Sequence, residues 1–127
     1  MARLLVVDDE PDILDLVVRR MVQAGHEVLA AGSGALALTL TERHGAPDAV
    51  VLDIDMPGMD GFALLEQLRQ RRPGLPALFL SVLCGGEIHP RLRDTGAAYL
   101  SKPFSAADLR LGVQRLLGGG ATAPRCP

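Results

Sequence analysis

The stretch that decides the fold is Leu4-Leu5-Val6-Val7-Asp8-Asp9-Glu10-Pro11, residues 4–11 of the chain. Its first half is a continuous apolar run, which is typical of a short strand buried on both faces of a parallel sheet. Its second half places adjacent carboxylates where that strand ends, followed by a proline, which suits the first turn of a helix. The stretch therefore predicts a strand, an acidic strand end and a helix in direct succession.

The same succession of apolar run and helical segment recurs along the chain. Strands are predicted at about Arg3–Val7, Glu27–Ala31, Ala49–Leu52, Ala77–Leu80 and Ala98–Leu100. Apolar residues at helical spacing predict helices that begin near Pro11, Ser33, Phe62 and Ser105. A short or irregular fourth helix is expected only at about 90–95, because Pro90 would remove a hydrogen bond from a helix interior. This alternation predicts an α/β domain whose parallel sheet is covered by helices on both faces.

Length, composition and charge exclude several classes of protein. The 127 residues suffice for one domain, expected at residues 1–117, with 118–127 as a flexible tail or the start of a linker. A formal net charge of −2 gives no electrostatic footprint for nucleic acid, so we expect no binding to nucleic acid by this domain. No apolar stretch approaches the roughly 20 residues of a membrane-spanning helix, so a cytoplasmic location is expected.

Polar residues directly follow four of the five predicted strands. They are Asp8-Asp9, Asp53, Ser81 and Lys102-Pro103. In an open parallel sheet, ligands bind outside the carboxyl ends of the strands, so these side chains are expected to meet at one edge. Carboxylates gathered there repel one another unless a cation is bound, and oxygen ligands without any soft ligand favour Mg²⁺. The sequence thus predicts a site for magnesium and a phosphoryl group.

Each of these residues has an expected role in phosphoryl transfer. Asp53 stands alone at the end of the central strand and is the candidate nucleophile, which would form an aspartyl phosphate. Asp8 and Asp9 are adjacent and are better arranged to hold the metal and its waters. Lys102 would neutralise one phosphoryl oxygen, and Ser81 would donate a hydrogen bond to another.

These motifs together resemble one known family. Asp8-Asp9-Glu10-Pro11, Asp53 with Met56-Pro57-Gly58-Met59-Asp60-Gly61, Ser81, and Ser101-Lys102-Pro103-Phe104 are similar to the receiver domain of two-component response regulators. The resemblance covers Ala2 to about Leu117. It implies a flavodoxin-like (CheY-like) doubly wound five-stranded parallel sheet with strand order 2-1-3-4-5 and five helices. It also implies that Asp53 accepts a phosphoryl group from a sensor histidine kinase or phosphotransfer protein.

The resemblance implies further details of the site. Asp9 and Asp53 would bind Mg²⁺ directly, Asp8 mainly through water, and the backbone carbonyl of Asp55 would complete the protein ligands. The Lys102-Pro103 bond would be cis, and Tyr99 would be the aromatic switch residue that turns inward when Ser81 moves toward the phosphate. The domain would act as a switch that catalyses only its own phosphorylation and dephosphorylation, controlling a C-terminal output domain or a partner, with homodimerisation possible.

Two residues depart from the family pattern, and two other functions compete. Val82 stands where the family usually has a small residue, and Asp55 adds a carboxylate near the acceptor; both bear on the lifetime of the phosphorylated state. Asp53-Ile54-Asp55 also looks like the paired-aspartate motif of haloacid-dehalogenase-like phosphatases, although there it follows the first strand. A third hypothesis is a receiver-like module that binds partners and is never phosphorylated.

Overall fold

A computed structural model of the chain describes residues 2–81, 92 and 95–118. Five parallel strands form one sheet in the order β2-β1-β3-β4-β5, which is the predicted order. The strands are β1 (Arg3–Val7), β2 (Glu27–Ala31), β3 (Ala49–Asp53), β4 (Ala77–Ser81) and β5 (Ala98–Ser101). Every residue of β3 and β4 is buried, because both faces of the central sheet are covered.

The described residues include four helices, where five were expected. They are α1 (Pro11–Gln23), α2 (Gly34–His44), α3 (Gly61–Arg71) and α5 (Ala106–Leu117). The expected fourth helix falls almost wholly outside the described residues, as do Val82 and the tail from residue 119. Within the part of the chain that the structure describes, no helix is long and apolar enough to cross a bilayer.

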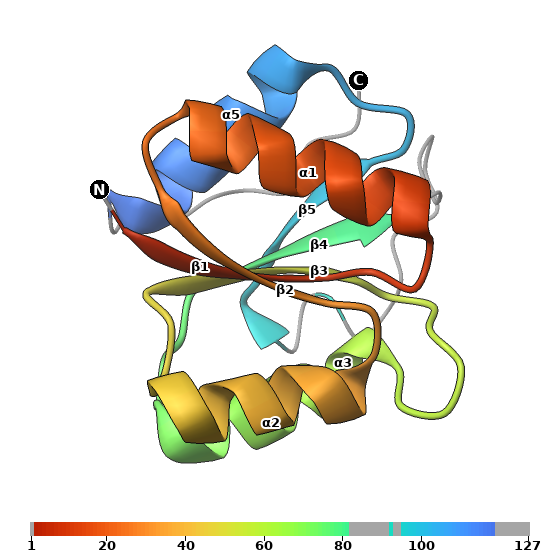
Figure 1. The fold of residues 1–127 in the computed structure, drawn as a ribbon, viewed down its shortest axis with the longest axis vertical. Helices are drawn as coiled ribbons and strands as arrows, with labels where there is room; N and C mark the ends of the chain where they lie inside the picture. Colours follow the sequence, from red (N-terminus) through yellow and green to blue (C-terminus); the bar gives the residue numbers. More distant parts are fainter. Residues whose placement is uncertain (1, 82–91, 93–94, 119–127) are drawn as a thin grey trace.

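The helices cover the two faces of the sheet in pairs, with α1 and α5 on one side and α2 and α3 on the other (Figure 1). Side chains of a strand alternate between these faces. Leu4 and Val6 accordingly belong to the cluster that packs against α1 and α5, whereas Leu5 and Val7 belong to the cluster beneath α2 and α3. Two apolar layers thus pack against the sheet, one on each face.

Three strands extend one residue further than the sequence predicted. Asp53, Ser81 and Ser101 are the last residues of β3, β4 and β5, where the expected strands ended just before them. The sheet hydrogen bonds continue through these polar residues: the Ile54 N–H donates to the Leu80 carbonyl at 3.4 Å and the Lys102 N–H to the Ser81 carbonyl at 2.6 Å. Asp53 and Ser81 are consequently part of the sheet, whereas Asp8 and Lys102 directly follow the last residues of β1 and β5.

Candidate functional site

The carboxyl ends of the strands bring together residues that are far apart in the sequence. Asp8 follows β1 and its N–H donates to the Ala31 carbonyl at the end of β2. Asp53 ends the neighbouring strand β3, and Lys102 follows the edge strand β5. Asp8 is fully buried and Asp53 is 6% exposed, so both carboxylates are largely withdrawn from water.

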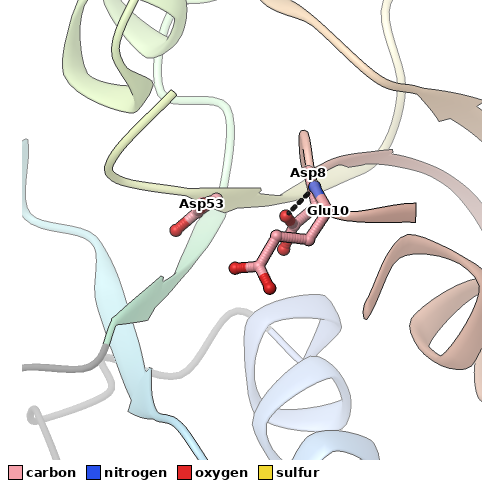
Figure 2. A group of neighbouring side chains, drawn as sticks. All are labelled: Asp8, Glu10 and Asp53. Carbon is pink, nitrogen blue, oxygen red and sulfur yellow. Dashed lines mark hydrogen bonds between the residues drawn. The ribbon is translucent and has the colours of Figure 1, made fainter. Parts of the chain in front are cut away.

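The Lys102 ammonium is the centre of this arrangement. Its Nζ lies 3.4 Å from Asp8 Oδ2, 3.5 Å from Asp53 Oδ1 and 3.6 Å from Glu10 Oε1. Figure 2 shows Asp8, Glu10 and Asp53 as neighbours, with the Glu10 backbone N–H donating to the Asp8 carboxylate at 2.9 Å. One positive charge is therefore shared among three negative ones, and the site retains an excess of negative charge.

Burial and neighbouring negative charges raise the pKa of both Asp53 and Asp8 above the usual value of a carboxyl group. Loss of water raises the pKa of Asp53 to about 6, and the Asp8 charge adds to the rise, while Lys102 opposes it. Burial likewise raises the pKa of Asp8, against the Glu10 N–H and the Lys102 ammonium, which favour the ionised form. Ionising both carboxylates therefore costs free energy that a cation would recover.

The pKa of Lys102 is also raised, but by a different balance of effects. Its burial lowers the pKa of the ammonium, but attraction to Asp53 and Asp8 outweighs this and leaves the pKa raised. Although the side chain is only 11% exposed, its attraction to the two carboxylates keeps the ammonium charged at the edge of the sheet. A fixed cation next to a carboxylate at this position can neutralise charge that develops on a group attached to Asp53.

The donor set suits a divalent metal ion. One carboxylate oxygen from each of Asp8, Glu10 and Asp53 lies within 4.8 Å of the others. All are hard oxygen donors, which Mg²⁺ prefers. The predicted Asp9 side chain is exposed and lies outside this group, yet its charge still contributes to the raised pKa of Asp53. Asp55 is also exposed, and its backbone N–H donates to the Asp53 carboxylate.

The other expected site residues lie close to this edge or behind it. Ser81 is buried at the end of β4, opposite Ser101 in the sheet register. The Lys102-Pro103 bond is cis, as the resemblance implied. Tyr99 is buried among the apolar residues beneath α2 and α3, so its ring already lies inward in this structure. Val82 is not among the described residues.

Glu10 is the one member of the cluster for which the sequence predicts no role beyond its place in the acidic motif before Pro11. A usable signal existed, because a carboxylate two residues after Asp8 is placed by the same strand end and the same helix start. A side chain that is 62% exposed could nevertheless have pointed to solvent, and only the structure shows it beside Lys102.

Comparison with known proteins agrees with this geometry. The sequence pattern of the response regulator receiver domain matches residues 4–114, most of the chain. The chain belongs to the receiver family of two-component response regulators. This result leaves the haloacid-dehalogenase-like hypothesis without support, and the exposed Asp55 side chain adds nothing to it.

Two relatives of this receiver domain are longer than the region that matches it. The probable transcriptional regulatory protein TcrX of Mycobacterium tuberculosis is 38% identical over 114 residues, covering 89% of this chain and 48% of the relative. The DNA-binding dual master transcriptional regulator RpaA of Synechocystis is 37% identical over 126 residues, covering 92% and 49%. The chain thus spans about half the length of these curated relatives.

Solved structures confirm the fold of the receiver domain. The chemotaxis protein CheY4 of Vibrio cholerae superposes with a TM-score of 0.84 at 32% identity, covering 92% of this chain and 99% of that chain. The receiver domain of NtrX from Brucella abortus gives a TM-score of 0.77 at 35% identity, with coverage of 91% and 98%. Both matches extend over nearly the whole chain, so the flavodoxin-like architecture is established for it.

Removing the positive charge of Lys102 is expected to destabilise the metal-free receiver. In Lys102→Met, Asp8 and Asp53 lose their shared counter-ion, and at pH 7.5 the free energy of unfolding should fall by about 1–2 kcal/mol. Urea denaturation with a chelator present measures the loss, and millimolar MgCl₂ should recover more stability in the variant than in the wild type. Equal stability of the two proteins in chelator would contradict the charge-sharing seen at Lys102.

Proposed function

We propose that this receiver domain accepts a phosphoryl group on Asp53 in a Mg²⁺-dependent reaction and changes conformation in response. The observation that carries the proposal is the placement of Asp53. It ends the central strand β3, lies 3.5 Å from the Lys102 ammonium and is grouped with Asp8 and Glu10. A nucleophile, a fixed cation and a set of metal donors are the parts that phosphoryl transfer to a carboxylate requires.

The residues of the chain divide the work of the transfer. An oxygen of Asp53 attacks the phosphorus of a phosphohistidine or a small acyl phosphate; the new O–P bond forms as the bond to the donor breaks. With a pKa of about 6, Asp53 is mostly ionised at pH 7.5 and has the lone pair that attack needs. Lys102 receives one phosphoryl oxygen and Ser81 donates to another. Bound Mg²⁺, held by Asp8, Asp9, Asp53 and the Asp55 carbonyl, would supply neutralising charge for the transferring group.

The consequence of phosphorylation is a switch and not turnover of a substrate. The added phosphoryl group brings about −1.5 to −2 charge next to Lys102 and Ser81, which would draw both toward it. The proposed donor is a sensor histidine kinase or phosphotransfer protein in the cytoplasm. Because the regulators that match this chain are about twice its length, the readout is proposed to be an attached output domain or a separate partner.

The test is phosphoryl attachment measured as mass. Incubation with acetyl phosphate and MgCl₂ should add about 80 Da to the intact chain, and the gain should be absent when a chelator replaces the metal. Peptide mapping after borohydride reduction of the acyl phosphate should place the modification at Asp53. No gain in mass with acetyl phosphate or with a phosphorylated histidine kinase would favour the receiver-like module that only binds partners.

A further inference from the structure

Glu10 occupies a helix-capping position without capping the helix. It is the N-cap residue of α1, where Ser, Thr, Asp or Asn usually accepts a hydrogen bond from the first turn. The Glu10 side chain makes no such bond. Its carboxylate instead lies 3.6 Å from the Lys102 ammonium, although the side chain is 62% exposed and solvent is available to it. The side chain at the N-cap of α1 therefore contacts Lys102 and does not cap the helix.

The backbone of Glu10 is tied to the inner part of the same site. Its N–H donates to Asp8 Oδ1 at 2.9 Å, while Asp8 Oδ2 contacts Lys102 at 3.4 Å (Figure 2). Asp8 thus orients the main chain from which the Glu10 side chain reaches outward. The three partners of Lys102 consequently form a gradient of burial, with Asp8 and Asp53 inside and Glu10 at the rim.

The Lys102 ammonium contacts both inner carboxylates, so a divalent cation bound to them would compete with it. Both are positive, and charges within about 4 Å repel by several kcal/mol near a protein surface. The 11% exposed Lys102 side chain has little freedom to leave the site altogether. Glu10 offers it a third carboxylate partner, on a side chain that is more exposed than Asp8 and Asp53.

We propose that Glu10 is a positioning residue of the cation site, which holds the Lys102 ammonium at the rim while a divalent cation takes over Asp8 and Asp53. The inference rests on the proposed function and adds where the Lys102 ammonium lies when a cation binds to Asp8 and Asp53. Two effects of Glu10 act in the same direction: its negative charge attracts the cation, and its contact gives the Lys102 ammonium a partner once the cation displaces it from the oxygens of Asp8 and Asp53. Loss of Glu10 weakens cation binding on both counts.

Titration with Mn²⁺, followed by the loss of the free-ion EPR signal, tests the inference without any phosphorylation step. Glu10→Gln should raise the dissociation constant about 3- to 10-fold. Glu10→Asp keeps the charge but is one methylene shorter, and an Asp at the N-cap favours bonding to the helix backbone. It should therefore also bind Mn²⁺ more weakly than the wild type. Glu66→Gln, an equal change of charge on the exposed side of α3, is the matched control and should bind as the wild type does.

The outcomes separate this inference from the proposed function. If the wild type binds Mn²⁺ and is phosphorylated while Glu10→Gln binds with unchanged affinity, the inference is overturned and the proposed function stands. If Glu10→Asp matches the wild type and Glu10→Gln does not, charge alone suffices and the positioning role is wrong. A wild type that binds no cation and takes up no phosphoryl group would overturn both.

Discussion

Replacing Asp53 with Asn is expected to abolish phosphoryl uptake and, in the same molecule, to make the metal-free receiver more stable at pH 7.5. The first effect follows because an amide has no ionised oxygen to attack phosphorus. The second follows because the Asp53 carboxylate is 6% exposed and close to the Asp8 charge. Asn removes a charge that the folded state holds at a cost, while Lys102 keeps Asp8 and Glu10 as partners.

The raised pKa of Asp53 determines the direction of the stability effect and the pH range in which it appears. The pKa of Asp53 is raised from 3.8 to about 6 on folding, so the folded state holds its proton more tightly than the unfolded state does. The stability that this proton contributes is present below about pH 4 and is lost as the pH rises through about 6. Converted in full to a free energy of unfolding, this pKa shift would correspond to about 3 kcal/mol. Screening by water at the open edge of the sheet reduces the expected effect to about 1–2 kcal/mol.

Urea denaturation of wild type and Asp53→Asn in chelator, from pH 4 to pH 8, measures the difference. The free energy of unfolding of the Asn variant, relative to that of the wild type, should rise between about pH 4 and 6 and stay constant above that range. Adding MgCl₂ should reverse the order, because the wild type binds the cation with one more carboxylate. If the variant is less stable than the wild type at pH 7.5 in chelator, the ionised Asp53 carboxylate does not destabilise the folded state and the argument is wrong.

Replacing Gly61 with Ala is expected to be among the most damaging single changes in this domain. A Cβ at this position would lie 2.2 Å from the Asp53 carbonyl oxygen and 3.1 Å from the Ile54 Cα. These are backbone atoms, and the Gly61 N–H is itself bonded to the Ile54 carbonyl at 2.8 Å. Because no flexible side chain can move aside, the start of α3 or the end of β3 must shift, at about 2–4 kcal/mol.

The effect should extend to function, since the clash is with the backbone of Asp53, the proposed phosphoryl acceptor. Urea denaturation of Gly61→Ala should show the predicted loss of about 2–4 kcal/mol in the free energy of unfolding. The variant should also take up phosphoryl groups more slowly than the wild type at saturating MgCl₂. Gly112→Ala is the matched control, because its Cβ would meet only the Leu78 side chain, at 3.3 Å. Better helix propensity offsets that contact, so its stability should change by less than about 1 kcal/mol. Similar losses in the two variants would refute the argument.

The sequence was enough to predict the residues that share the edge of the sheet. Asp8, Asp53 and Lys102 each follow or end a strand, and the parallel order fixes which strand ends are neighbours, so their meeting needs no knowledge of rotamers. The family pattern added the order 2-1-3-4-5 and the cis Lys102-Pro103 bond, and the structure confirms both.

What the sequence could not supply is the direction of individual side chains. Glu10 and Asp9 are adjacent acids on the same turn, yet only Glu10 joins the cluster around Lys102. That choice depends on χ angles and on the Glu10 N–H bond to Asp8, which no periodicity encodes. The inward Tyr99 ring is a similar case, since either orientation is compatible with a strand whose faces are both covered.

The hydrogen bond from the Lys102 N–H to the Ser81 carbonyl, 2.6 Å long, links the backbones of the two residues proposed to detect the phosphoryl group. Neither main chain can be displaced far without pulling the other along. The ends of β4 and β5 are therefore mechanically coupled, and the proposed responses of the hydroxyl and the ammonium are expected to occur together. Such linkage would favour an all-or-none output over a graded one.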